Sequence, residues 1–141
     1  MKLLISELRP VVNAGGLGPT LRSFITEQQN PNDLKLLIHV DGDKALEPKE
    51  EQILFCIARE SLNNAAKHVG TGQAEVRLHL TERPSLEIED KGRGFDLEQV
   101  KFGKGLGLRI MAEQAAEIGW NIVVISAPGK GMVVRVEKKP A

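Results

Sequence analysis

The segment IEDKGRGFDLEQVKFGKGLGLRIM, residues 88 to 111, holds five of the fourteen glycines of the chain. Before it, in SLEIED (85–90), apolar and polar residues alternate, which predicts a half-buried strand. After it, LGLRIMAEQAAEIG (106–119) has the apolar spacing of an amphipathic helix. The glycine-rich segment therefore joins a strand to a helix, and its glycines would allow the backbone to come close to a ligand.

The rest of the chain shows the same two periodicities. Helices are expected at roughly 19–29, 48–68 and 106–119, and strands at 34–40, 74–80, 85–90, 121–126 and 131–137. The order is helix, strand, helix, two strands, glycine-rich segment, helix, two strands. It predicts an α+β fold, a two-layer α/β sandwich in which about three helices cover one face of a mixed, largely antiparallel sheet.

Composition limits what such a domain can do. The 141 residues, 41% of them hydrophobic, are enough for one globular domain with one core. Nineteen basic residues balance nineteen acidic ones, so no overall field attracts nucleic acid or an anionic membrane. The apolar runs are much shorter than the roughly 20 residues of a membrane span, and the first residues lack a signal-peptide pattern. A soluble domain is expected.

Two short patterns carry candidate chemistry. Glu60 and Asn64 lie one helical turn apart, so their oxygens could hold a magnesium ion together, although the same pair also suits a solvated helix face. Asp90 opens DKGRG, which is either a plain hairpin turn or a place where a flat ligand donates an exocyclic amine to the carboxylate.

A third pattern, GKGLG (103–107), directly precedes a helix and would present backbone amides to phosphates. Two commoner phosphate motifs do not fit. A Rossmann fingerprint needs an apolar strand before its glycines, but FDLEQVKF (95–102) stands there. A Walker A loop needs Ser or Thr after GxxxxGK, which neither FGKGL (102–106) nor PGKGM (128–132) supplies. A phosphate site here belongs to another class.

Four segments together resemble the N, G1, G2 and G3 boxes of the GHKL ATP-binding fold, which sensor histidine kinases, gyrase B and related ATPases share. They are ESLNNAAKH (60–68), EDKGRGFD (89–96), GKGLGL (103–108) and APGKGMVVRV (127–136). The resemblance covers roughly residues 34 to 137.

The opening ELRP, followed by GGLGPTLRSF, is similar to the kinase branch whose partners are response regulators of the NarL type. In that branch LRP ends the second helix of the dimerisation and phosphoacceptor domain. The resemblance thus implies that residues 1–10 are the C-terminal stump of that helix. Residues 11–141 are expected to form the catalytic ATP-binding domain.

The resemblance implies catalytic roles for Glu60, Asn64 and Lys67. Asn64 would ligate the magnesium ion that bridges the ATP phosphates, Glu60 would support that metal or orient the reaction, and Lys67 would approach phosphate oxygens. Asp90 would read the adenine amino group. The other implied nucleotide contacts are His68, Gly92, Gly94, Gly103, Lys104, Gly105, Leu106, Gly107, Gly131 and Met132. Many relatives have Thr where this chain has Met132.

The implied function is that of a protein-histidine kinase domain that passes the γ-phosphoryl group of Mg-ATP to a histidine on the phosphoacceptor helices, for relay to a NarL-type response regulator. None of His39, His68 and His79 has the sequence context of that acceptor, so the chain is expected to bind ATP without phosphorylating itself. Two alternatives stay open: an anti-sigma-factor-type serine kinase of the same fold, and a degenerate nucleotide-binding module.

The resemblance also bears on partners and location. It implies a cytoplasmic domain of a bacterium, with no nucleic-acid partner and no membrane contact of its own. The full-length parent is expected to form a homodimer through the phosphoacceptor helices, and this chain by itself a monomer. The sequence leaves open whether the parent is anchored in a membrane.

Overall fold

The computed structural model describes residues 16–27, 34–69, 72–91, 107–126 and 131–140. In chain order the elements are α2 (Leu17–Glu27), β1 (Leu34–Gly42), α3 (Pro48–Val69), β2 (Gly72–Leu80), β3 (Ser85–Asp90), α5 (Leu108–Glu117), β4 (Trp120–Ser126) and β5 (Met132–Lys138). This order confirms the one predicted from the sequence. None of the helices in these ranges combines the length and the apolar character that a membrane span requires.

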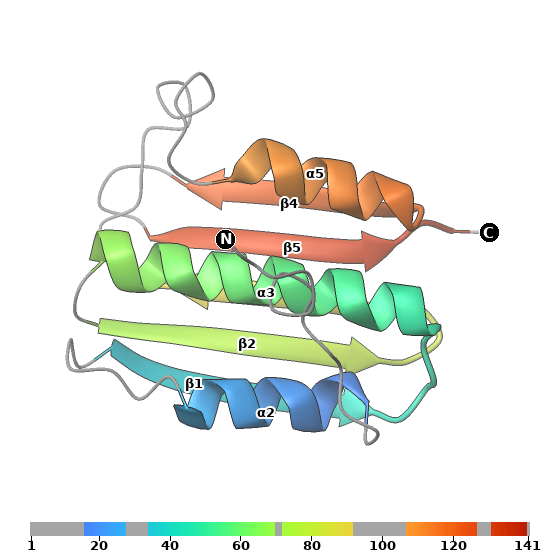
Figure 1. Cartoon of the computed structure of the whole chain (residues 1–141), viewed down its shortest axis with the longest axis horizontal. Helices are drawn as coiled ribbons and strands as arrows, with labels where there is room; N and C mark the ends of the chain where they lie inside the picture. The colour runs from blue at the N-terminus through green and yellow to red at the C-terminus, as the bar shows by residue number, and fades with distance from the viewer. Residues whose placement is uncertain (1–15, 28–33, 70–71, 92–106, 127–130, 141) are drawn as a thin grey trace, which may run out of the picture.

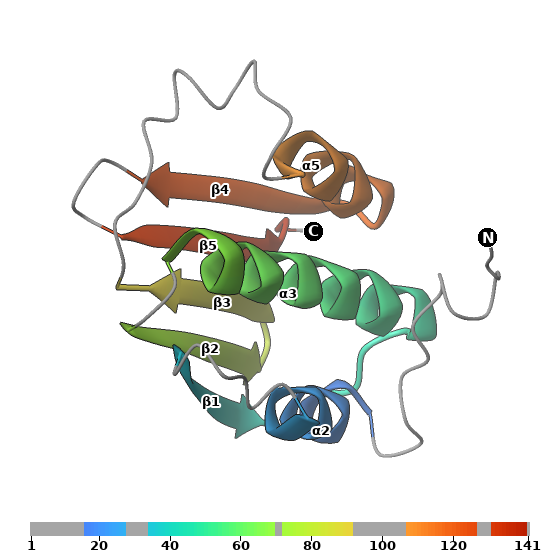
Figure 2. The ribbon, with the colours of Figure 1, turned by 60° about the vertical axis from the view of Figure 1, so that its left-hand side comes forward.

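The described strands form one five-stranded sheet in the order β1-β2-β3-β5-β4. β1 pairs with β2 in parallel, and the other neighbours pair antiparallel, so the sheet is mixed and largely antiparallel as predicted. α2, α3 and α5 lie on the same face of the sheet in both views (Figures 1 and 2). The predicted two-layer α+β sandwich is therefore confirmed.

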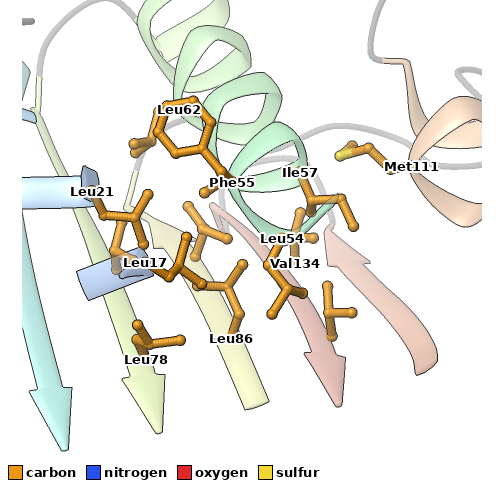
Figure 3. Close-up of a cluster of buried hydrophobic side chains, with 14 of the residues drawn as sticks. Leu17, Leu21, Leu54, Phe55, Ile57, Leu62, Leu78, Leu86, Met111 and Val134 are labelled. Carbon is orange, nitrogen blue, oxygen red and sulfur yellow. The ribbon is translucent and has the colours of Figure 1, made fainter. Parts of the chain in front are cut away.

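The core lies between α3 and the sheet, because apolar and polar residues alternate along the strands. The apolar residues of β2, β3 and β5 point to the helices at every second position, while α3 presents apolar residues at helical spacing (Figure 3). The buried residues that meet there include Leu54, Ile57, Ala58, Leu62, Ala74, Val76, Leu78, Leu86, Ile88, Val134 and Val136.

α2 begins two residues before the predicted position, because its start is fixed from elsewhere in the chain. The backbone N–H of Leu17 donates to Oε2 of Glu51 on α3, at 3.3 Å. Gly16, with φ of 97°, precedes the helix, and its carbonyl accepts from the backbone N–H and the hydroxyl of Thr20. Pro19 is thus the third helical residue, where its missing N–H still costs nothing.

A buried carboxylate fixes the start of α3. Oε1 of Glu50 accepts from the backbone N–H of Glu47 (3.0 Å), and Oε2 accepts from Nε1 of Trp120 (3.0 Å) and lies 3.3 Å from Nζ of Lys138. Burial by itself raises the pKa of Glu50, but these three contacts outweigh it and hold the pKa below its ordinary value. One side chain thus joins α3 to β4 and β5.

The opposite face of the sheet carries charges that neutralise each other. The guanidinium of Arg77 on β2 reaches the carboxylates of Glu75, Glu87 and Glu89, and Arg135 on β5 also reaches Glu87. The register places Arg77 opposite Glu87, and Glu87 opposite Arg135. This network ties the outer surfaces of β2, β3 and β5 together.

Candidate active site

Most of the predicted site residues belong to elements that meet at one end of the molecule. In Figure 1 the C-terminal end of α3 and the start of β5 lie at this end and the start of α5 is turned toward it, and Figure 2 shows that the end of β3 lies there too. Several predicted contacts fall outside the described residues: Gly92, Gly94, Gly103, Lys104, Gly105 and Leu106. Lys67 and His68 lie in the last turns of α3, but the placement of their side chains also falls outside the description.

Asp90 is the last residue of β3 and continues its buried side. Leu86, Ile88 and Asp90 alternate toward the helices, and Asp90 is 6% exposed. Across the sheet it pairs with Ala74 on one side and with Met132 on the other. The fold thus puts a carboxylate at the end of an apolar row, beside the thioether of Met132, which is 3% exposed. An acceptor in such surroundings suits an amine donor on a flat, mostly apolar ligand.

Gly131 lies directly beside Asp90. Its φ is 77°, and a Cβ at this position would lie 2.3 Å from the backbone oxygen of Asp90. Only glycine allows the two backbones to come this close. The hydroxyl of Ser126 donates to the carbonyl of Gly131 at 2.9 Å, which joins the end of β4 to the start of β5. Gly131 therefore defines the backbone next to the Asp90 carboxylate.

Glu60 and Asn64 lie on the C-terminal half of α3, one turn apart. Asn64 is buried, at 1% exposure, and Glu60 is half-buried. A Cβ on Gly107 would lie 3.3 Å from Oε2 of Glu60, and Gly107 immediately precedes α5. The structure thus brings the Glu60 carboxylate to the N-terminal end of α5, where the helix dipole is positive.

This oxygen-donor set fits a magnesium ion that arrives with a phosphate ligand. An amide oxygen and a carboxylate are hard ligands of the kind magnesium takes from proteins. Within the described part of the chain, no group of three or more His, Cys, Asp or Glu side chains could hold a metal. Because magnesium needs six ligands, phosphate oxygens and water would have to supply most of them.

Two residues of this region had no role in the sequence analysis. Ser61, next to Glu60, is 2% exposed, and its hydroxyl donates to Sδ of Met111 on α5 at 3.6 Å. Helical periodicity indicates that each side chain is buried. No sequence pattern indicates that the two meet, since they are fifty residues apart.

Comparison with known proteins gives the family. Residues 49–141 match the family described as histidine kinase-, DNA gyrase B-, and HSP90-like ATPase. The chain is 35% identical over 141 residues to the sensor histidine kinase LiaS of Bacillus subtilis, in an alignment that covers 97% of this chain and 38% of LiaS. It is also 35% identical over 132 residues to the sensor histidine kinase YhcY of the same organism, covering 93% of this chain and 34% of YhcY. The chain therefore spans less than two fifths of the length of these relatives.

A solved structure shows the same fold. The blue-light activated histidine kinase of Erythrobacter litoralis EL346 superposes with a TM-score of 0.73 at 21% sequence identity, covering 87% of this chain and 41% of that chain.

Proposed function

Because the chain belongs to the family of histidine kinase-, DNA gyrase B- and HSP90-like ATPases, we propose that it is the ATP-binding catalytic domain of a two-component sensor histidine kinase. It binds Mg-ATP and donates the γ-phosphoryl group to a histidine of a phosphoacceptor domain, from which a NarL-type response regulator receives it. On this proposal residues 1–10, which lie outside the described part of the chain, belong to the phosphoacceptor domain, and residues 11–141 form the catalytic domain. The domain works in the bacterial cytoplasm, and its full-length parent forms a homodimer.

The observation that carries the proposal is that the fold places two unlike groups on neighbouring elements, since α3 packs on β3. Asp90 and Gly131 form a buried acceptor beside apolar surface, which suits the amine edge of adenine. Glu60 faces the start of α5, and the buried Asn64 lies one turn further along α3, which suits the phosphates and their metal. Adenine and triphosphate are the two ends of one ligand.

The residues of the chain have separate tasks in the transfer. Asp90 accepts the adenine amine and fixes the base. Asn64 and Glu60 would hold magnesium, which supplies neutralisation of the phosphate charge when bound. The first amides of α5, with Lys67, His68 and Lys104, orient the phosphate oxygens. Positioning and charge stabilisation of this kind supply most of the rate in phosphoryl transfer.

The chemical step needs no covalent protein intermediate in this domain. A nitrogen of the acceptor imidazole forms a bond to the γ-phosphorus while the bond from that phosphorus to the bridging oxygen breaks. ADP leaves with the electron pair. The role left to this chain is to hold the γ-phosphoryl group in line with the acceptor histidine and to keep water away from it.

The test uses the chain fused to the phosphoacceptor helices of its parent, with labelled ATP and magnesium. The wild-type fusion is expected to form acid-labile phosphohistidine, and Asn64→Ala to lose at least about 100-fold in rate, the loss typical of removing one transition-state contact. Asn63→Ala, on the neighbouring position of the same helix, is the matched control and should keep the wild-type rate. Absence of phosphohistidine, or equal rates in wild type and Asn64→Ala, would refute the proposal. Label on a serine would favour the serine-kinase alternative.

A further inference from the structure

The buried contact between Ser61 and Met111 joins α3 to α5 beside the candidate active site. The hydroxyl of Ser61 lies 3.6 Å from Sδ of Met111, and the two residues are 2% and 1% exposed. In Figure 3 the Met111 side chain extends from α5 toward α3. A buried hydroxyl needs a hydrogen-bond acceptor, and here the thioether supplies it. This contact therefore favours one alignment of the two helices.

Each of these two residues is also connected directly to a residue of the candidate site. Ser61 follows Glu60 on α3, and the backbone N–H of Met111 donates to the carbonyl of Gly107 at 3.0 Å, closing the first turn of α5. Glu60 in turn faces Gly107. Glu60, Ser61, Gly107 and Met111 thus form one connected set of contacts between α3 and α5. A shift of α5 along α3 would break the Ser61–Met111 hydrogen bond and move Gly107 away from Glu60.

We propose that Ser61 and Met111 are a positioning pair for the phosphate end of the nucleotide, an inference that rests on the proposed function. The pair holds the first amides of α5 at a fixed spacing from Glu60 and Asn64, so that one triphosphate meets both. Asp90 ends β3 and Gly131 directly precedes β5, so neither belongs to this set of contacts. Loss of the Ser61–Met111 contact therefore lowers the affinity for the phosphates of ATP and leaves the affinity for its adenosine part unchanged.

The experiment compares the affinity of the purified chain for ATP with its affinity for adenosine, by calorimetry in the presence of magnesium. Ser61→Ala and Met111→Leu each remove one partner with little change in volume. Each is expected to weaken ATP binding about three- to tenfold, the range of one neutral hydrogen bond, with adenosine affinity unchanged. The double variant should bind ATP no more weakly than the worse single variant, because both substitutions remove the same interaction.

Two further variants separate positioning from general stability. Ser61→Cys keeps a weak donor and should recover part of the ATP affinity. Thr20→Val removes another buried hydroxyl, which donates to the carbonyl of Gly16 at the start of α2, far along the chain from the site. It should lower the melting temperature without changing the ratio of ATP to adenosine affinity.

Each outcome decides one question. If wild type binds ATP but Ser61→Ala keeps the wild-type ratio of ATP to adenosine affinity, the contact only stabilises the fold and the inference fails alone. Additive losses in the double variant would overturn it in the same way. If wild type fails to bind ATP, the proposed function fails, and the inference fails with it.

Discussion

Gly131 and Gly119 have nearly the same positive φ, 77° and 76°. They differ in surroundings. A Cβ on Gly119 would have no heavy atom within 4 Å, whereas a Cβ on Gly131 would lie 2.3 Å from the backbone oxygen of Asp90. The pair therefore separates two reasons for a glycine: the left-handed conformation and the close approach of a neighbouring strand.

We expect Gly119→Ala to lower the free energy of unfolding by about 1–2 kcal/mol, the cost of one left-handed residue. Gly131→Ala should cost about 1–3 kcal/mol more, because the clash is with backbone that cannot rotate away. It should also weaken ATP binding, since relief of the clash moves Asp90. Urea denaturation of both variants measures the first difference and calorimetry the second. Equal losses of stability would show that β5 can retreat from β3 without cost.

At the scale of the elements, Glu50 connects the first turn of α3 to β4 and β5. Its pKa is below the ordinary value of 4.5, so its ionised form contributes stability that is complete above that pH and is lost as the pH falls through the lowered pKa. Glu50→Gln cannot ionise. It should cost about 1–3 kcal/mol at neutral pH, the loss typical of buried hydrogen bonds to a charged group.

The difference in free energy of unfolding between wild type and Glu50→Gln is expected to narrow as the pH falls below about 4.5. Urea midpoints measured from pH 7 to pH 3 give it directly. Glu117→Gln is the control, because that carboxylate is 54% exposed and lies 3.9 Å from Lys49. A difference in free energy of unfolding that stays constant over this range would mean that the charge of Glu50 does not strengthen its contacts.

The outer surface of the sheet offers a second test at this scale. The hydrogen bond to Glu89, with the nearby carboxylates of Glu75 and Glu87, raises the pKa of Arg77, which therefore stays charged. Arg77→Lys should lower stability by about 1 kcal/mol or more, since an ammonium cannot serve several carboxylates in a fork. Arg109→Lys, in an exposed pair with Glu113, should cost at most about 0.5 kcal/mol. Urea denaturation of both variants measures the two losses of stability. Equal losses would contradict a special role for the guanidinium of Arg77.

The elements also show how much of the fold could be predicted from the sequence. Alternation in SLEIED gave β3 with its observed bounds, and the spacing of apolar residues gave the buried face of α3. The start of α2 was missed, because Glu51 fixes it from 34 residues away. The contact of Ser61 with Met111 was missed for the same reason. Periodicity indicates which side of an element is buried, but not which residue of another element it will meet.

At the scale of the whole molecule, the sheet separates the candidate site from two of the three histidines. His39 and His79 belong to the strand positions that face away from the helices. Nε2 of His39 lies 2.7 Å from Glu75, and Nδ1 of His79 lies 3.6 Å from Asp41. Glu60 and Asn64 lie on α3, on the opposite face.

A phosphoryl group held beside Asn64 therefore cannot reach His39 or His79 of the same copy, since transfer needs the two reacting atoms within about 3–3.5 Å. The chain alone, with labelled ATP and magnesium, is expected to form no acid-labile label on either histidine. In the fusion with the phosphoacceptor helices, His39→Ala/His79→Ala should keep the wild-type rate. Label on the isolated chain that this double substitution removes, at a rate independent of protein concentration, would contradict the arrangement. Such transfer within one copy would require the site to open across the sheet, so the measurement tests the two-layer architecture as well as the chemistry.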